Sequence, residues 1–240
     1  MNNFGRKLAE KIGINVQGGT VHVGEIRLDS EMSRQEFRNR QALLNLVKTA
    51  WVEGVLEKSL HEQIPIVLGL EKRESAVASP WNLNFIKADQ EPEPLPAGTP
   101  VIDVFDKLGA GGTLLILGEP GSGKTITLLQ LARDLIKRAE DDGSYRIPVV
   151  LNLSSWAVGK QNIAQWIVEE LNSKYQINKK IGQQWVEKQE LLLLLDGLDE
   201  IRDLKDRNAC VMALNTFQQK QATEIVVCCR VQDYGKLGIS

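Results

Sequence analysis

Hydrophobic residues gather into short runs along this chain, and the clearest is a run of leucines at residues 191–195. The run is too short for a bilayer, because a membrane-spanning helix needs roughly 20 apolar residues. Central strands of parallel sheets are buried on both faces and read as continuous apolar runs instead of alternating ones. We therefore predict a buried strand here, with Asp196, Asp199 and Glu200 just beyond its carboxyl end.

Short apolar runs and segments of helical periodicity alternate along the sequence after residue 100. The strands are predicted at residues 113–118, 147–153, 191–195 and 224–229, and the helices at residues 101–108, 125–140, 162–171 and 203–221. Strands that alternate with helices imply right-handed crossovers and a parallel sheet covered on both faces. The predicted fold class is therefore α/β, with three layers.

The first hundred residues follow another pattern. Apolar side chains spaced by three and four predict a helix over residues 33–60 with one packing face. That face consists of Leu44, Val47, Trp51 and Val55. The dipeptide Gly18-Gly19 suits the turn of a β-hairpin at residues 14–23. Four prolines break the acidic stretch at residues 88–100, which favours a linker.

These patterns divide the chain into four parts. We predict an N-terminal arm with a hairpin at residues 1–30, a helical region at 31–86, a proline-rich linker at 87–100 and the α/β core at 101–240.

Composition narrows the function classes. The formal net charge of -2 argues against a broad surface for DNA or RNA. Three cysteines in 240 residues make no disulfide framework, which favours a reducing, cytoplasmic compartment. The N-terminus lacks the long apolar core of a secretory signal, and no segment of the sequence reads as a membrane span. We therefore expect neither nucleic-acid nor membrane binding.

A glycine-rich motif, GEPGSGKT, lies between the strand predicted at 113–118 and the helix predicted at 125–140. It fits the G-x-x-x-x-G-K-[ST] phosphate loop, in which glycines let backbone amides curl around phosphate oxygens. Its predicted phosphate-binding residues are Gly118, Glu119, Pro120, Gly121, Ser122, Gly123, Lys124 and Thr125. Lys124 is placed to reach the outer phosphates, and the Thr125 hydroxyl to ligate Mg²⁺.

The acids after the leucine run fit the same chemistry. Asp196, at the strand tip, is predicted to hold Mg²⁺ opposite Thr125, because the dication makes a carboxylate compatible with a triphosphate. Asp199 or Glu200 would orient or deprotonate the attacking water, and the choice between them stays open. Arg230, at the end of the last strand, is predicted to contact the γ-phosphate.

Together, GEPGSGKT, the LLLLLDGLDE element, IPVVLNLSSWAV and IVVCCR resemble the NACHT family of STAND-class P-loop NTPases, in particular its bacterial members. The resemblance covers about residues 99–235 and implies an AAA+/STAND-like P-loop core behind a small, mostly helical N-terminal region. It implies catalytic roles for Asp199, Glu200, Lys124 and Arg230, and a metal site at Thr125 and Asp196.

The resemblance further implies a switch in signal transduction or defence that binds ATP or ADP with Mg²⁺ and hydrolyses slowly. GTP is kept open as the nucleotide. Nucleotide-dependent self-association and an unknown protein partner at the N-terminal region would accompany that role. The family's fifth core strand, helical lid and winged-helix segment have no counterpart in these residues, so we expect a truncated form in which hydrolysis is weak.

Three alternatives remain. A conventional P-loop ATPase or small-molecule kinase would use the same phosphate loop. A Ras-like GTPase would carry an Asn-Lys-x-Asp segment, but Asn178-Lys179-Lys180-Ile181 lacks the Asp that pairs with guanine. A non-enzymatic interaction module would use the P-loop fold as a scaffold for the N-terminal region.

Overall fold

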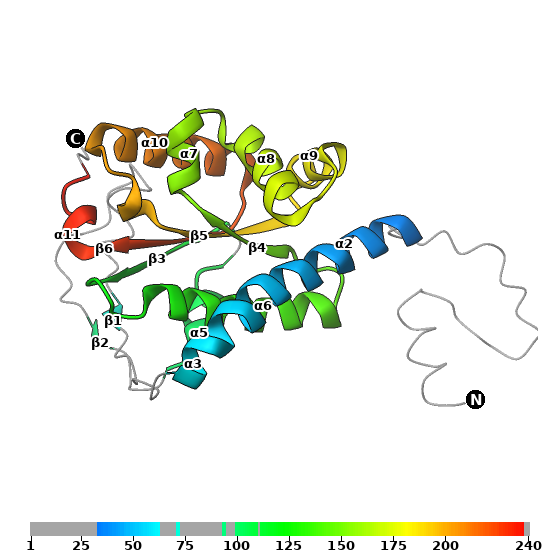
Figure 1. The fold of residues 1–240 in the computed structure, drawn as a ribbon, viewed down its shortest axis with the longest axis horizontal. Helices are drawn as coiled ribbons and strands as arrows, with labels where there is room; N and C mark the ends of the chain where they lie inside the picture. Colours follow the sequence, from blue (N-terminus) through cyan, green and yellow to red (C-terminus); the bar gives the residue numbers. More distant parts are fainter. Residues whose placement is uncertain (1–32, 63–70, 73–92, 95–98, 110, 238–240) are drawn as a thin grey trace, which may run out of the picture. The chain divides into compact units, whose positions relative to one another are not determined.

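The computed structural model describes residues 33–62, 71–72, 93–94, 99–109 and 111–237 (Figure 1). The hairpin predicted at residues 14–23 lies outside them. The chain divides into two units, Met1–Phe37 and Arg38–Ser240.

A parallel sheet of four strands forms the centre of the second unit. The strands are β3 (Thr113–Gly118), β4 (Ile147–Asn152), β5 (Leu191–Asp196) and β6 (Ile225–Arg230), in the order β3-β6-β5-β4. All three neighbouring pairs are parallel, as predicted. The leucine run forms most of β5, an inner strand, and none of these leucines is more than 6% exposed. The prediction of a strand buried on both faces is confirmed.

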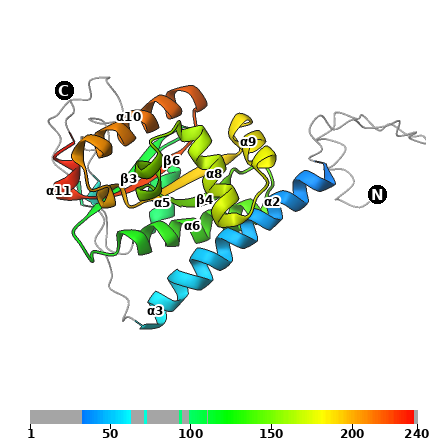
Figure 2. The same cartoon turned by 45° about the horizontal axis from the view of Figure 1, so that its top comes forward.

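Helices cover both faces of this sheet, which confirms the three-layer α/β class (Figure 1). Their bounds are α5 (Val101–Asp106), α6 (Lys124–Asp141), α7 (Ser154–Gly159), α8 (Ile163–Tyr175), α9 (Lys179–Glu187), the 3₁₀ turn η2 (Leu198–Glu200), α10 (Leu204–Gln221) and α11 (Val231–Tyr234). The views from two directions place α5 and α6 on one face and α7, α8 and α10 on the other (Figure 2).

The predicted helices correspond to α5, α6, α8 and α10, whereas α7, α9 and α11 were not predicted. The sequence of α9 contains Gly182, a poor helix former that hides the helical signal. In the fold Gly182 is buried against Leu171 of α8, so tertiary packing overrides the local propensity. The N-cap of α9 is Asn178, whose side chain accepts a hydrogen bond from the Lys180 amide.

The N-terminal helix consists of α2 (Arg34–Val47), the π-helical segment η1 (Lys48–Glu57) and α3 (Lys58–Glu62). Ser33 and Glu36 form a capping box at its start: the Ser33 hydroxyl accepts from the Glu36 amide at 3.1 Å, and the Glu36 carboxylate accepts from the Ser33 amide at 2.8 Å. The helix predicted over residues 33–60 is therefore present.

The packing face of this helix differs from the prediction in its second half. Leu44 and Val47 are buried as expected, but Trp51 and Val55 are only partly buried, and Val52 and Leu56 take their places in the core. A spacing of three and four assumes the α-helical period, whereas a π-helix pairs residues five apart. The π-helical segment therefore moves the buried face by one residue.

Residues of the N-terminal helix from Arg38 onward pack on the α/β core. The buried Arg40 guanidinium donates to two backbone carbonyls. One is that of Ala139, in the last turn of α6, and the other is that of Tyr145, in the segment after α6. The Trp51 indole donates to the Tyr175 hydroxyl at 2.9 Å, and this hydroxyl donates to the Val150 carbonyl of β4 at 2.6 Å. The helix is thus tied to a helix and a strand of the core.

Two more segments are described away from the sheet. β1 (Glu71–Lys72) pairs antiparallel with β2 (Glu93–Pro94), and β2 lies within the stretch predicted as a linker. The boundaries of the four predicted parts remain predictions. Within the described part of the chain, no helix combines the length and the apolar character needed to cross a bilayer.

Candidate functional site

The predicted site residues gather at the carboxyl edge of the sheet. Gly118, the last residue of β3, pairs with Arg230 at the end of β6, and Asn152 at the end of β4 pairs with Asp196 at the end of β5. Open α/β sheets bind their ligands at this edge. Four strands therefore bring their terminal residues to one edge of the sheet.

The loop between β3 and α6 depends on glycine at several positions. Gly121 and Gly123 have φ angles of 75° and 85°, the left-handed region that suits glycine, and Gly123 caps the start of α6. A Cβ atom on Gly118 would lie 2.2 Å from the Ser122 hydroxyl oxygen. The Ser122 amide donates to the Glu119 carbonyl at 3.1 Å and closes the turn. The curled backbone ends at a helix N-terminus, an arrangement suited to phosphate groups.

The Lys124 side chain arches back over this loop. Its ammonium donates to the carbonyls of Gly118 and Glu119, both at 3.1 Å. The positive charge is thereby held at the opening of the loop, where it would meet the phosphates of a ligand.

Thr125 and Asp196 are in direct contact. The Thr125 hydroxyl donates to one carboxylate oxygen of Asp196 at 2.8 Å, and the other carboxylate oxygen accepts from the Gly197 amide at 2.9 Å. Hydroxyl and carboxylate oxygens are the hard donors that Mg²⁺ takes, and Mg²⁺ combines one or two carboxylates with waters and substrate phosphates. The donor chemistry of this pair therefore fits Mg²⁺. Among the described residues, no group of three or more His, Cys, Asp or Glu side chains is arranged for a metal.

Glu200 is held by Asn152, which was not among the predicted site residues. The Asn152 amide nitrogen donates to a Glu200 carboxylate oxygen at 2.9 Å, and the Asn152 carbonyl oxygen accepts from the Ser154 amide at 2.8 Å. Gly197, with a φ of 77°, lets the chain turn between Asp196 and Glu200. A Cβ atom on Gly197 would lie 2.7 Å from the Glu200 oxygen that accepts from Asn152. The signal in the sequence was a polar residue ending an apolar strand, as Asp196 does in β5.

Asp199 faces other partners than its neighbour Glu200. Its carboxylate pairs with Arg230 at 2.6 Å and is 8% exposed, whereas Glu200 is exposed. Its backbone carbonyl accepts from Arg207 of α10 at 3.2 Å. Arg207 could not be predicted from the sequence either, since a polar residue inside a helix carries no sign of burial. The two candidate water-activating acids therefore have distinct environments.

The thiol of Cys228 lies beneath the start of α6. Its sulfur is 3.7 Å from the Lys124 carbonyl oxygen. Burial, with a smaller effect of the Asp196 carboxylate, raises the pKa of this thiol well above its usual range. The neutral thiol adds no charge beside the phosphate loop.

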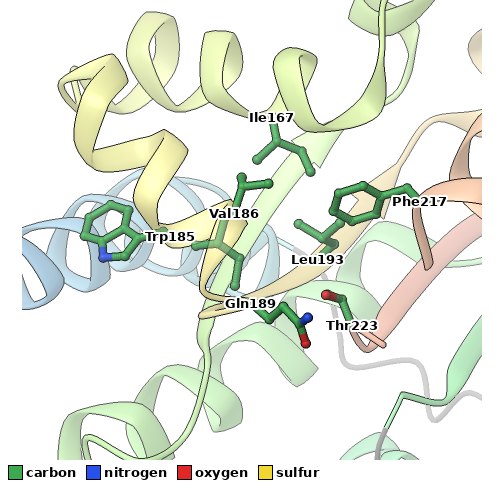
Figure 3. A pocket seen from close by; sticks show the side chains of 8 residues that line it. Ile167, Trp185, Val186, Gln189, Leu193, Phe217 and Thr223 are labelled. Carbon is green, nitrogen blue, oxygen red and sulfur yellow. The ribbon is translucent and has the colours of Figure 1, made fainter. Parts of the chain in front are cut away.

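A small apolar pocket lies far from these residues, at the amino edge of the sheet (Figure 3). Its volume is about 10 Å³, which is barely enough for one water molecule. It is lined by Ile167, Trp185, Val186, Gln189, Leu191, Leu193, Phe217 and Thr223. The pocket is a small packing defect between α8, α9, α10 and the sheet, and it contains none of the predicted site residues.

Comparison with known proteins gives one match. The family model described as NACHT domain matches residues 112–231, half of the chain, from the residue before β3 to the first residue of α11. Neither the curated proteins nor the solved structures give a match. The matched residues contain the phosphate loop, the acids after β5 and Arg230. The chain therefore belongs to the NACHT domain family, and this membership implies a nucleotide-binding function of the NTPase type.

Proposed function

We propose that the chain binds a nucleoside triphosphate with Mg²⁺, hydrolyses it slowly and acts as a nucleotide-dependent switch in signal transduction or defence. ATP is favoured over GTP. The observation that carries the proposal is the 2.8 Å contact between the Thr125 hydroxyl and the Asp196 carboxylate, from residues 71 positions apart. This contact joins the end of the phosphate loop to the acidic strand tip, as phosphoryl-transfer chemistry requires.

Each residue has a distinct task in this function. The loop amides from Gly118 onward and the Lys124 ammonium would bind the phosphates, and Thr125 and Asp196 would hold Mg²⁺. The metal, when bound, supplies positive charge between the phosphates and the carboxylates. Glu200 is exposed and oriented by Asn152, which suits it to accept a proton from the attacking water. Asp199 is engaged by Arg230 and is less suited to that task.

The preference for ATP has a structural support. The one segment that resembles a guanine-reading motif begins at Asn178, and its side chain is used as the N-cap of α9, with the Lys180 amide 2.9 Å away. A side chain engaged in this way is not free to read a base.

Calorimetric titration with ATP, ADP and GTP, each with and without Mg²⁺, tests the proposal. We expect Mg²⁺-dependent binding of ATP that is lost in Lys124→Ala. Lys137→Ala is the matched control, because Lys137 is an exposed lysine on the same helix and its removal changes the net charge equally. Retained ATP affinity in Lys124→Ala would refute the proposal.

A turnover assay separates binding from hydrolysis. We expect Glu200→Gln to keep ATP affinity and to lose phosphate release, because the amide binds no proton at neutral pH. Unchanged turnover in this variant would exclude Glu200 as the general base.

Two further parts of the proposal concern the cell. A reducing, cytoplasmic location is supported by the free cysteines, Cys210, Cys228 and Cys229, all of which are buried. Nucleotide-dependent self-association rests on the family resemblance, and light scattering with ATP and with ADP tests it. A particle mass that is the same with both nucleotides would speak against it.

A further inference from the structure

The loops that follow β5 and β6 are joined by a ring of four charged residues. The Arg230 Nε atom lies 2.6 Å from the Asp199 carboxylate, and Arg207 donates to the Asp199 backbone carbonyl at 3.2 Å. The other end of the Arg207 guanidinium donates to the Asp233 carboxylate at 2.9 Å. Asp233 lies on α11, the helix that begins directly after Arg230, so the backbone closes the ring.

Three members of the ring are largely buried, and the fourth, Arg230, is about half exposed. The side chains of Asp199, Arg207 and Asp233 are 8%, 7% and 18% exposed, whereas that of Arg230 is 45% exposed. Arg207 also donates to the Ile201 carbonyl at 2.9 Å, so its guanidinium is held from several sides. Arg230 can therefore leave Asp199 without disturbing the other contacts of the ring.

Arg230 stands beside the phosphate loop. It pairs with Gly118, the first residue of that loop, in the register of β3 and β6. A guanidinium presents five N–H donors in a planar fork and binds carboxylates and phosphates alike. The terminal phosphate of a triphosphate held by the loop would therefore compete with the Asp199 carboxylate for the Arg230 guanidinium.

We propose that Asp199 is an internal counter-ion of Arg230 that competes with the terminal phosphate of the bound nucleotide, and so limits the preference for triphosphate over diphosphate that Arg230 provides. This inference rests on the proposed function. Arg230 leaves Asp199 only when a terminal phosphate is present, and it returns when the phosphate departs. A carboxylate that is nearly buried then stands without its cation, which weakens triphosphate binding. Asp199 is thus a positioning residue for Arg230, and Glu200 keeps the task of activating water.

The test is a set of calorimetric titrations with ATP, ADP, GTP and GDP in the presence of Mg²⁺. The variants are Asp199→Asn, Arg230→Gln and the double variant. We expect Asp199→Asn to tighten triphosphate binding by roughly two- to fivefold, the scale of a half-exposed ion pair, and to leave diphosphate binding unchanged. Arg230→Gln should remove the difference between triphosphate and diphosphate, and the double variant should behave like Arg230→Gln.

Asp206→Asn is the matched control. Asp206 lies on α10 and forms a 2.6 Å ion pair with Lys160, which is not a member of the ring. The control should leave all four affinities unchanged. A gain in triphosphate affinity of the same size in this variant would overturn the inference, because the effect would then not depend on Arg230.

Several results would overturn the inference alone. One is that Asp199→Asn binds triphosphates no more tightly than the unaltered chain does. Another is that the double variant keeps the gain in triphosphate affinity. If Asp199→Asn does not fold, the test falls on Arg230→Gln, and a triphosphate preference retained there overturns the inference. In these cases nucleotide binding by the unaltered chain still supports the proposed function. No nucleotide binding by the unaltered chain would overturn both.

Discussion

Removal of one hydroxyl group tests whether the N-terminal helix belongs to the same folding unit as the sheet. The Tyr175 hydroxyl accepts from the Trp51 indole of η1 at 2.9 Å and donates to the Val150 carbonyl of β4 at 2.6 Å. Burial raises the pKa of Tyr175 far above its usual value, so this hydroxyl keeps its proton in neutral solution. Tyr175→Phe removes both hydrogen bonds and keeps the ring.

The size of the effect follows from these two bonds. Each hydrogen bond contributes about 1 kcal/mol net, and each buried partner left unpaired costs about 1–3 kcal/mol, so we expect a loss of about 2–4 kcal/mol in the free energy of unfolding. For a unit of about 200 residues this corresponds to a fall in Tm of roughly 4–16 °C. Trp51→Phe removes one of the same bonds, so the two changes together should cost less than the sum of their separate costs.

Urea unfolding followed by circular dichroism measures these free energies. Tyr145→Phe is the matched control, since it removes the same atom from a side chain that is 51% exposed, and we expect a change within about 0.5 kcal/mol. A loss below about 0.5 kcal/mol in Tyr175→Phe, or strict additivity with Trp51→Phe, would refute the coupling between the helix and the sheet.

Three further predictions concern the site and the core. Asn152→Ala should lower turnover, measured as phosphate release, by roughly fivefold, because it removes a hydrogen bond to Glu200 worth about 1 kcal/mol. ATP affinity, measured by calorimetry, should stay unchanged. Gly118→Ala places a Cβ atom 2.2 Å from the Ser122 hydroxyl oxygen, so ATP affinity measured by calorimetry should fall on the order of tenfold or more, and an unchanged affinity would contradict the loop geometry. Burial raises the pKa of the Cys210 thiol to about 12, so the folded chain keeps a proton that the unfolded chain loses above about pH 8.5. The free energy of unfolding, measured by urea unfolding, should therefore fall as the pH rises from about 8 to about 10. The fall should be less steep in Cys210→Ala.

The parts of the fold that could be predicted are those whose local pattern already reflects the tertiary environment. The leucine run of β5 is apolar at every position because both of its faces are covered, and only an inner parallel strand needs such a sequence. The phosphate loop was recognisable because its glycines are required by the backbone turn itself. The contact between Thr125 and Asp196 followed, since parallel strands deliver their carboxyl ends to one edge.

The charged network around Asp199 could not be predicted, because it depends on contacts between segments distant in sequence. Arg207 is buried by η2 and α11, and nothing in the sequence of α10 distinguishes it from a solvated helix residue. The ion pair between Arg230 and Asp199 depends on β5 and β6 being neighbours, which the order of elements along the chain does not reveal. The role of Asn152 was likewise hidden, because it depends on the pairing of β4 with β5.

The strand order also determines when the site can form. β6 lies between β3 and β5, and residue 113 pairs with residue 225, so the strand that carries the phosphate loop pairs with a strand that is synthesised much later. Such pairings between distant segments form slowly, because a long loop must close before the contact stabilises it. During synthesis the phosphate loop therefore emerges long before the sheet that holds it in place. A nucleotide that binds only the assembled site would stabilise chains in which β6 is already inserted between β3 and β5. It would thus shift the folding equilibrium toward correctly folded molecules at the last step.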